Sequence, residues 1–406
     1  MAISEFLFLD SSSGNVASTA AVPEMIHILR KHLGMDIAFV GEFTGGNRQI
    51  RLVDSEEENC AIRVGTCSPE QESYCKLIID GRLPHVMNRV DDYPLAAALS
   101  VTKELGIGSY LAAPIHLSDG TIYGTLCCYS HAPEPSLNHR DLAMIKACAE
   151  MTAKQIEKHR QSTSRQHETR RRIEGIFTSD ALHSVYQPIL DLACQRIVGF
   201  EALSRFKGMD TGPDTVFRDA YEVGLGCSLE VMAIKSGLDA LAHIASDLYV
   251  AFNVSPEALL DPEFAQVFAN MPMDRITLEI TEHAAVEHYQ EILSALIPLR
   301  RDGMQLAVDD AGAGFASFRH ILELAPDKIK LDACLTKNIE GDPSRRALIA
   351  AFVQFAGDTG SKLIAEGVET DAQLNALKEL GVEKIQGNLI GKPMPLDEAV
   401  NISYKS

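Results

Sequence analysis

The sequence predicts an α/β protein in which an α+β domain is followed by a polar connecting segment and then a closed (β/α) barrel. Its 406 residues exceed what a single hydrophobic core usually holds. From residue 179 onward, short apolar runs alternate with stretches of helical periodicity, as in βαβ units. The stretch Glu157–Arg172 contains no apolar residue apart from the methyl groups of threonine. We therefore expect three parts, with bounds 1–156, 157–178 and 179–406.

The first part mixes strand and helix signals, which is typical of an α+β domain. Ile37–Glu42 and Gln49–Val53 are β-like runs separated by a turn signal that contains two glycines. Tyr110–Ile115 and Ile122–Tyr129 flank a Ser-Asp-Gly turn and are expected to form a hairpin. A helix with an apolar face is expected next, over 141–156.

The polar segment after this helix is expected to be either a solvated helix or a flexible linker. Its pattern offers no apolar face that could be buried against another element. The run Arg170–Arg172 could suggest nucleic-acid binding. However, Lys plus Arg number 37 against 56 Asp plus Glu, so the net charge is −19, and a solvated connecting helix is favoured.

The last part has the rhythm of a parallel sheet with crossover helices. Seven or more βα units in about 225 residues favour a closed barrel over an open doubly wound sheet. The β-like runs are Ile197–Leu203, Leu248–Val254, Ile276–Ile280, Gln305–Val308, Lys328–Leu331, Lys362–Ala365 and Glu383–Ile385.

Polar side chains that can bind metal or move a proton stand in or directly after nearly every one of these runs. In a barrel, the carboxyl ends of the strands converge on one mouth, where active sites are built. We therefore expect these residues to share one cleft: Glu201, Asn253, Glu279 with Glu282, Asp309 with Asp310, Lys330 with Asp332, Glu366 with Glu369, and Gln386.

So many carboxylates require cations if they are to share a cleft, because like charges at close range destabilise one another. A ligand set of carboxylates and one amide, without Cys or His, suits Mg²⁺ or Mn²⁺. The adjacent Asp309 and Asp310 could hold two metals, as in phosphoryl transfer. Lys330 could orient or deprotonate a water, or could be a counter-ion. A two-carboxylate glycosidase explains the acids, but not Lys330, Asn253 or the paired aspartates.

These motifs resemble, in order, those of the EAL family of cyclic di-GMP phosphodiesterases. Glu201-Ala202-Leu203 is similar to the signature that names the family, and the other motifs are spread over some 220 residues. They are Tyr186–Ile189, Phe252–Ser255, Leu278–Glu282, Val308–Asp310, Lys330–Asp332, Ala365–Thr370, Gln386-Gly387 and Gly391–Pro395. The resemblance implies a modified TIM barrel and an enzyme that hydrolyses cyclic di-GMP to linear pGpG with two metals, Mg²⁺ or Mn²⁺.

The resemblance also implies roles for individual residues. The implied metal ligands are Glu201, Asn253, Glu279, Asp309, Asp310 and Glu366. The implied catalytic residues are Lys330, which would position or activate the attacking water, with Gln386, Glu366 and Glu201. The implied substrate-binding residues are Gln187, Arg205, Asp332 and Pro393. Glu282 matches the glutamate that anchors the loop following the paired aspartates.

That loop departs from the family pattern, which usually contains the sequence DDFGTGYSS. This chain has Asp309-Asp310-Ala311-Gly312-Ala313-Gly314-Phe315-Ala316-Ser317, so both aspartates remain while the Phe, Thr, Tyr and first Ser positions differ. The departure keeps open an alternative of a different class, in which the barrel is a weak or inactive cyclic di-GMP receptor that signals through the linker.

The first part resembles a GAF sensor domain, on Ser109–Ile115, Gly124–Cys128 and the helix that ends at Ile156. GAF domains bind nucleotides, haem, bilins or no known ligand, and no residue here decides among them. Cys75 and His85 are candidates to hold a chromophore or haem, although buried cysteines are more often core residues. The resemblance implies that this domain regulates the barrel.

The composition indicates which classes of partner the protein can bind and in which compartment it is found. The net charge of −19, the absence of Trp and an aromatic content of 6% argue against a nucleic-acid polymer or an anionic membrane as partner. No uncharged apolar run approaches 18 residues, and the first ten residues lack a basic region, so we expect neither a membrane span nor a secretory signal. Nine cysteines without a CxxC pair favour a reducing cytoplasm. A homodimer is expected from the resemblance.

Overall fold

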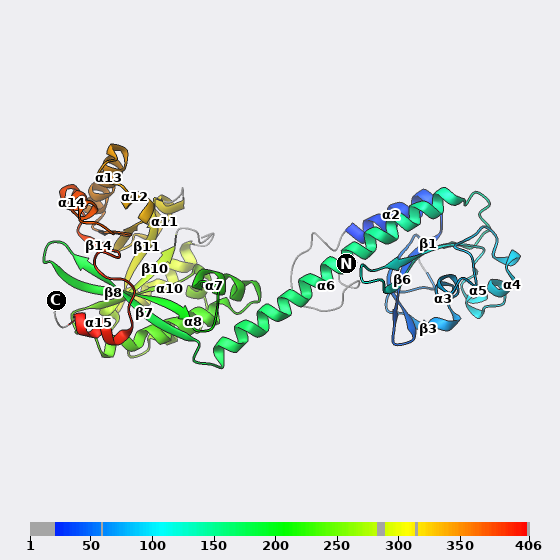
Figure 1. Cartoon of the computed structure of the whole chain (residues 1–406), viewed down its shortest axis with the longest axis horizontal. Coiled ribbons are helices and arrows are strands. Elements are labelled where there is room, and N and C mark those ends of the chain that lie inside the picture. Colours follow the sequence, from blue (N-terminus) through cyan, green and yellow to red (C-terminus); the bar gives the residue numbers. More distant parts are fainter. Residues whose placement is uncertain (1–20, 58–59, 282–288, 313–315, 404–406) are drawn as a thin grey trace. The chain divides into compact units, whose positions relative to one another are not determined.

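The computed structural model describes residues 21–57, 60–281, 289–312 and 316–403. The chain forms two compact units, Met1–Arg165 and Gln166–Ser406, and each is described by itself (Figure 1). Within the described residues, no helix is both long enough and apolar enough to cross a bilayer.

The first unit is built on a six-stranded antiparallel sheet in the order β3-β2-β1-β6-β5-β4. Both expected hairpins are confirmed, because β1 pairs with β2 through Thr44 and Asn47, and β5 pairs with β6 across the Ser-Asp-Gly turn. The strands are β1 (Ile37–Thr44), β2 (Asn47–Ser55), β3 (Cys67–Pro69), β4 (Val86–Met87), β5 (Ser109–His116) and β6 (Ile122–Ser130).

Helices cover both faces of this sheet, so the sheet is the middle layer of the unit (Figure 1). One face carries α2 (Ala21–Leu33) and the first half of α6 (His139–Phe177). The other face carries the short helices α3 (Tyr74–Ile79), α4 (Pro94–Ala97) and α5 (Ser100–Glu104). Successive side chains of a strand point to opposite faces, and the adjacent Cys127 and Cys128 of β6 accordingly belong to different cores.

The polar segment is helical, because α6 is one continuous helix of 39 residues. Its first turns bury Ile145, Ala149 and Ile156 in the first unit, and its last turns bury Ile173 and Ile176 in the second. Between these two apolar groups no side chain of α6 belongs to a core cluster. The segment is therefore anchored at both ends, which explains how a stretch without an apolar face is held as a helix.

The second unit is a closed eight-stranded barrel in the order β10-β11-β12-β13-β14-β7-β8-β9, which confirms the predicted fold class. A large core fills the space within the barrel and beneath the helices around it. The strands are β7 (Leu182–Asp191), β8 (Arg196–Phe206), β9 (Tyr249–Asn253), β10 (Ile276–Thr281), β11 (Gln305–Ala311), β12 (Lys328–Leu331), β13 (Lys362–Ala365) and β14 (Lys384–Gln386).

One strand departs from the parallel arrangement that the sequence predicted. β7 runs antiparallel to both of its neighbours, β8 and β14, while the other neighbouring pairs are parallel. Only four residues separate β7 from β8, too few for a crossover, so the two strands can pair only as a hairpin.

The barrel helices are α7 (Pro213–Glu222), α8 (Gly226–Leu238), α9 (Pro256–Leu259), α10 (Tyr289–Arg301), α11 (Ala316–Leu324), α12 (Ala333–Thr336), α13 (Pro343–Thr359), α14 (Asp371–Leu380) and α15 (Leu396–Ser403).

Candidate active site

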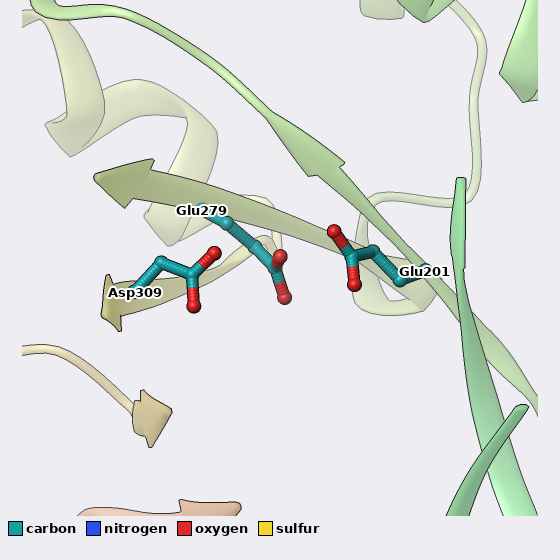
Figure 2. Close-up of side chains that lie close together, drawn as sticks. All are labelled: Glu201, Glu279 and Asp309. Atoms are coloured by element: carbon teal, nitrogen blue, oxygen red, sulfur yellow. The ribbon is translucent and has the colours of Figure 1, made fainter. Parts of the chain in front are cut away.

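Three strands bring carboxylates together at the mouth of the barrel. Glu201 of β8, Glu279 of β10 and Asp309 of β11 direct their carboxylates into the same space, as Figure 2 shows. All three side chains are buried, and one ligand oxygen from each lies within 4.8 Å of the others. Parallel neighbours place the same stretch of each strand at the same height, so residues distant in sequence meet here.

Lys330 of β12 lies at the centre of this group and joins four carboxylates. Its Nζ is 2.7 Å from an oxygen of Glu279, 2.7 Å from one of Glu366, 3.2 Å from Asp309 and 3.5 Å from Glu201. Its side chain is 1% exposed. Lys330 is therefore a buried cation held by several anions, which its position after an apolar run did not reveal.

The paired aspartates share the mouth because β11 is irregular between Val308 and Ala311, where its register with β12 shifts. In a regular strand, adjacent side chains point to opposite faces, which would separate Asp309 from Asp310. Here Asp310 has a left-handed backbone (φ 56°), an uncommon conformation that is found at functional sites. As a result, oxygens of Asp309, Asp310 and Glu366 lie within 4.8 Å of one another.

Amide side chains hold Glu201 in place. Asn253 donates to Glu201 Oε1 at 2.8 Å, and Gln386 donates to Glu201 Oε2 at 2.6 Å. The Nε2 of Gln386 also lies 3.0 Å from Gln187 Oε1, which connects β14 to β7. In the described part of the chain, Gln386 Oε1 is buried without a hydrogen-bond partner. This atom is thus an acceptor that a water could satisfy.

Gly387 permits the backbone approach that positions Gln386. A Cβ at Gly387 would lie 2.2 Å from the carbonyl oxygen of Val368 and 2.3 Å from its nitrogen, distances that no side chain can occupy. The N–H of Val368 donates to the carbonyl of Gln386 at 3.1 Å. The position after Gln386 therefore requires a glycine, because any side chain there would collide with the backbone of Val368.

Burial and mutual repulsion change the pKa values of the acidic groups. Burial raises the pKa of Glu279 well above its usual range, raises the pKa of Asp309, and raises the pKa of Glu366 to about 8. In each case the neighbouring carboxylates raise the pKa further, whereas the charge of Lys330 lowers it. Burial acts the same way on Glu201, but the charge of Lys330 and the amide donors outweigh it, so that pKa is lowered. Burial opposes the charge of Lys330, yet four carboxylates raise its pKa well above the usual value.

The donor set fits divalent cations. Five carboxylates face one ammonium group, so the ionised cluster carries a large excess of negative charge inside the protein. The oxygens form two overlapping groups, Glu201–Glu279–Asp309 and Asp309–Asp310–Glu366, which share Asp309. Oxygen-only groups of this kind suit hard cations, and two groups with a shared ligand suit a pair of them.

The structure does not join every predicted site residue to this cluster. The guanidinium of Arg205 donates to the neighbouring carbonyl of Ser204 at 2.8 Å, and Asp332 caps α12 by accepting from the N–H of Cys334. Pro393 is half-buried and precedes Met394, which pairs with Tyr186 of β7. The predicted loop anchor Glu282 and the altered positions 313–315 lie outside the described residues.

A second buried lysine lies below the site and was missed by the sequence analysis. Lys328 Nζ donates to Thr277 Oγ1 at 2.6 Å and lies 3.4 Å from the centre of the Tyr249 ring. Burial, aided by the charge of Lys384, lowers the pKa of Lys328 to about 7. The sequence did contain a signal for this second buried lysine. Lys328 and Lys330 are two residues apart in one strand, so their side chains must lie on the same face.

The two candidate ligand holders of the first unit have structural partners. Cys75 is fully buried, and its Sγ is 3.6 Å from that of Cys127. His85 is half-buried, and its Nδ1 is 3.0 Å from the carbonyl oxygen of Ala112. Cys75 thus lies in the core between α3 and the sheet, as the alternative interpretation of this residue expected.

Comparison with known families identifies both units. Residues 170–393 match the family model for the EAL domain, which is more than half of the chain, and residues 19–156 match the model for the GAF domain. The chain therefore belongs to the EAL domain family and carries a GAF domain before the barrel.

Individual relatives support this assignment. The cyclic di-GMP phosphodiesterase PA2567 of Pseudomonas aeruginosa is 29% identical over 233 residues, which are 54% of this chain and 40% of the relative. The cyclic di-GMP phosphodiesterase RocR of the same organism is 32% identical over 222 residues, covering 52% of this chain and 57% of the relative. The chain thus matches only about half the length of these relatives. A structure of the EAL enzyme Bd1971 shares the fold, with a TM-score of 0.58 and 16% identity over 91% of this chain and 93% of that one.

Proposed function

We propose that the barrel hydrolyses one phosphodiester bond of cyclic di-GMP, giving linear pGpG, with two divalent cations, Mg²⁺ or Mn²⁺. The observation that carries the proposal is the pair of overlapping carboxylate groups that share Asp309 at the barrel mouth. Two cations held by such a pair of groups would supply the charge stabilisation that a phosphoryl transfer needs. Named cyclic di-GMP phosphodiesterases among the relatives of the barrel support the choice of substrate.

The cations would be held by Glu201, Asn253, Glu279, Asp309, Asp310 and Glu366. When bound, they supply positive charge that offsets the carboxylates, and they lower the pKa of a bound water. A cyclic dinucleotide carries two phosphate charges, so this acidic mouth could not attract it without them.

Lys330 is proposed to orient the attacking water as a permanent cation. Its raised pKa means that the ammonium form persists at neutral pH, so the role of a base that removes a proton from water is not the one we assign. Gln386 is proposed to help through its buried Oε1, which can accept a hydrogen bond from that water. Both groups are held rigidly, Lys330 by its carboxylates and Gln386 by Glu201 and Gln187.

Substrate contacts are proposed for Gln187, Arg205, Asp332 and Pro393. Two hydrogen bonds support this role for Gln187, which accepts from Gln386 and donates to the carbonyl of Gly391 at 3.2 Å, in the segment before Pro393. Arg205, half-buried in β8, supplies a cation for a phosphate.

A direct assay tests the proposal. The full chain is incubated with cyclic di-GMP in EDTA, Mg²⁺, Mn²⁺ or Ca²⁺, and products are separated by chromatography. We expect pGpG with Mg²⁺ or Mn²⁺, none in EDTA, and little with Ca²⁺, whose longer bonds and looser geometry suit binding better than cleavage. Binding without cleavage under all conditions would instead identify a receptor.

We also propose that the GAF domain regulates the barrel through α6, in a cytoplasmic homodimer. Nine free cysteines support a reducing compartment, and light scattering tests the dimer. A four-residue Gly-Ser insertion after Gln166 interrupts α6 between its two anchored ends, and we expect it to change the hydrolysis rate about tenfold to a hundredfold. Rates are compared with and without cell extract, which supplies the GAF ligand. Equal rates would show that the domains are merely tethered.

A further inference from the structure

The α3 face of the GAF sheet buries an arginine that has no carboxylate partner. Arg48 of β2 is 7% exposed, its Nη2 donates to Ser68 Oγ at 3.2 Å, and its Nη1 lies 3.8 Å from the Sγ of Cys75. Its Nε is buried without a hydrogen-bond partner, and within the described ranges no carboxylate lies at ion-pair distance. A buried charge of this kind is costly unless an anion neutralises it.

Two thiols lie where that anion is required. The Sγ atoms of Cys75 in α3 and Cys127 in β6 are 3.6 Å apart, and both residues are 0% exposed. The Sγ of Cys127 lies 3.1 Å from Thr125 Oγ1, and the hydroxyl of Tyr110 is 3.6 Å from the Sγ of Cys75. The Sγ of Cys75 is thus surrounded by groups that can donate a hydrogen bond to it, the guanidinium of Arg48, the hydroxyl of Tyr110 and the thiol of Cys127.

The charge balance divides the pair into a thiolate and a thiol. The hydrogen bond with Cys127 lowers the pKa of Cys75 most strongly, burial opposes this, and Arg48 lowers it further, so that it falls well below the usual range. Burial and the neighbouring Cys75 raise the pKa of Cys127 well above its usual range. Together with the 3.8 Å distance from Arg48 Nη1 to its Sγ, this favours Cys75 as the thiol of the pair that ionises beside Arg48.

We propose that Cys75 and Cys127 form a redox modification site, in which a hydroperoxide converts the pair to a disulfide. The thiolate of Cys75 attacks one peroxide oxygen, which forms the sulfenic acid and releases an alkoxide or hydroxide. The sulfur of Cys127 then attacks the sulfenic sulfur, an S–S bond forms, and the departing hydroxyl takes the Cys127 proton to leave as water. Two thiol sulfurs are oxidised by two electrons in total, and one peroxide is reduced.

The structure around Cys75 and Cys127 favours formation of the S–S bond and favours a small oxidant. A disulfide bond is about 2.05 Å long, so the sulfurs must approach by about 1.5 Å. β6 is paired on both sides, with β1 and β5, whereas α3 has only six residues, so α3 is the element that moves. Both thiols are fully buried, so an oxidant must reach them through local opening of the fold, which favours hydrogen peroxide over a bulky disulfide.

Oxidation also changes the charge balance of this core. The disulfide is neutral, so Arg48 loses the anion beside it while its contact with the Phe39 ring remains. A cation left unpaired in a core destabilises its surroundings. We therefore expect the oxidised form to pack α3 less tightly against the sheet, which gives hydrogen exchange in α3 as a second signal.

The experiment uses the full chain and hydrogen peroxide. Protein at low concentration is treated with peroxide, free thiols are alkylated, and peptides cut after glutamate and lysine are analysed by tandem mass spectrometry. We expect a peptide linking Cys75 to Cys127, formed at least ten times faster than any oxidation of Cys128. Cys128 is the matched control, because it is on the same strand and equally buried, but burial and the neighbouring Cys148 raise its pKa.

Variants separate the proposed site from general oxidation. The link should persist in Cys128→Ser and disappear in Cys127→Ser. Arg48→Met should slow its formation at least tenfold, and Arg48→Lys, which keeps the charge, should slow it less. The wild-type measurement decides the matter even if a variant fails to fold. Free Cys75 and Cys127 after peroxide, or Cys75 linked instead to exposed Cys67, would overturn the proposal.

Discussion

Each of the two domains contains a buried cation next to ionisable groups, Lys330 in the barrel and Arg48 in the GAF domain, and the surroundings of these two cations differ in charge. Lys330 of the barrel contacts four carboxylates, so its surroundings carry excess negative charge. Arg48 of the GAF domain has no carboxylate partner among the described residues, and its neighbours are a thiol pair and the aromatic ring of Phe39.

This difference indicates which kind of ion each site requires for its charge to be balanced. Excess negative charge at the barrel mouth requires further cations, and the oxygen donors determine that these are hard divalent ions. Excess positive charge in the GAF core requires an anion, and the thiol of Cys75, 3.8 Å from Arg48 Nη1, is a nearby group that can become one without a ligand. The same physical cost, that of an unbalanced buried charge, thus underlies both the proposed metal site of the barrel and the proposed redox site of the GAF domain.

The largest expected effect tests the shared ligand of the barrel. Asp309→Asn keeps the shape of the side chain but removes the charge common to both carboxylate groups, so turnover of cyclic di-GMP should fall by about a thousandfold or more. Metal affinity, measured by calorimetry, should fall with it. Asp302→Asn changes an exposed carboxylate at 58% exposure and is the control. Hydrolysis by Asp309→Asn within tenfold of wild type would place the metals elsewhere.

The next effect distinguishes a buried lysine from an exposed one. Lys330→Ala should lower kcat about a hundredfold, as expected when a group that orients the water is lost, while KM changes much less. Lys362→Ala removes a half-exposed lysine that pairs with Glu383 at 3.0 Å, and a surface pair of this kind contributes little. Steady-state kinetics of both variants provide the comparison. A loss of affinity with kcat intact would make Lys330 a counter-ion only.

The unbalanced carboxylates predict how pH acts on the metal-free barrel. Burial raises the pKa values of Glu279, Asp309 and Glu366, the last to about 8, so the folded state holds protons that the unfolded chain has released above about pH 4.5. Stability in EDTA should therefore fall as pH rises from 5 to 8, by about 1–3 kcal/mol or about 5 °C in Tm.

Thermal scans at several pH values measure this slope. The lowered pKa of Glu201 makes stability rise with pH, but the raised pKa values of the other three carboxyl groups outweigh this effect. Saturating Mn²⁺ should raise Tm and remove most of the slope, because the cations then neutralise the carboxylates. Glu366→Gln in EDTA should flatten the profile. A Tm that rises from pH 5 to 8 in EDTA would contradict the assigned charge balance.

The smallest effect measures the pairing in the GAF core. Cys75→Ala leaves Arg48 unpaired and should destabilise the first unit by about 1–3 kcal/mol. In an Arg48→Leu background, the same change should cost about 1 kcal/mol less, because the cation is already absent. Scanning calorimetry of the four proteins completes the cycle. Strictly additive effects would show that Cys75 does not neutralise Arg48.

Local patterns predicted most of the fold. Both GAF hairpins follow from alternating apolar runs around glycine-containing turns, and the barrel follows from short strands at βα spacing. Metal-binding residues at successive strand ends were predicted to meet, and Glu201, Glu279 and Asp309 do so. The segment 157–172 could not be assigned from its own pattern, because the apolar residues that hold it as a helix lie outside it, at Ile156 and Ile173.

Three features of the site required tertiary structure. The direction of β7 depends on which strands close the barrel, and closure is a long-range property. Asp309 and Asp310 face the same mouth only because β11 bulges, whereas a regular strand would separate them. The four-carboxylate environment of Lys330 arises from side chains of different strands, so no local spacing could give its protonation state.

The sequence by itself determined the kinds of groups that this protein places together: oxygen donors at the ends of barrel strands, and cysteines in a helix and a strand of the GAF domain. Residue type and strand periodicity are local properties, and both are readable along the chain. The tertiary structure decided the charge balance of each group, because burial and the distances between strands set the cost of every charge. That balance leaves the barrel mouth short of cations, and it leaves Arg48 without a carboxylate among the described residues, with the sulfur of Cys75 beside it.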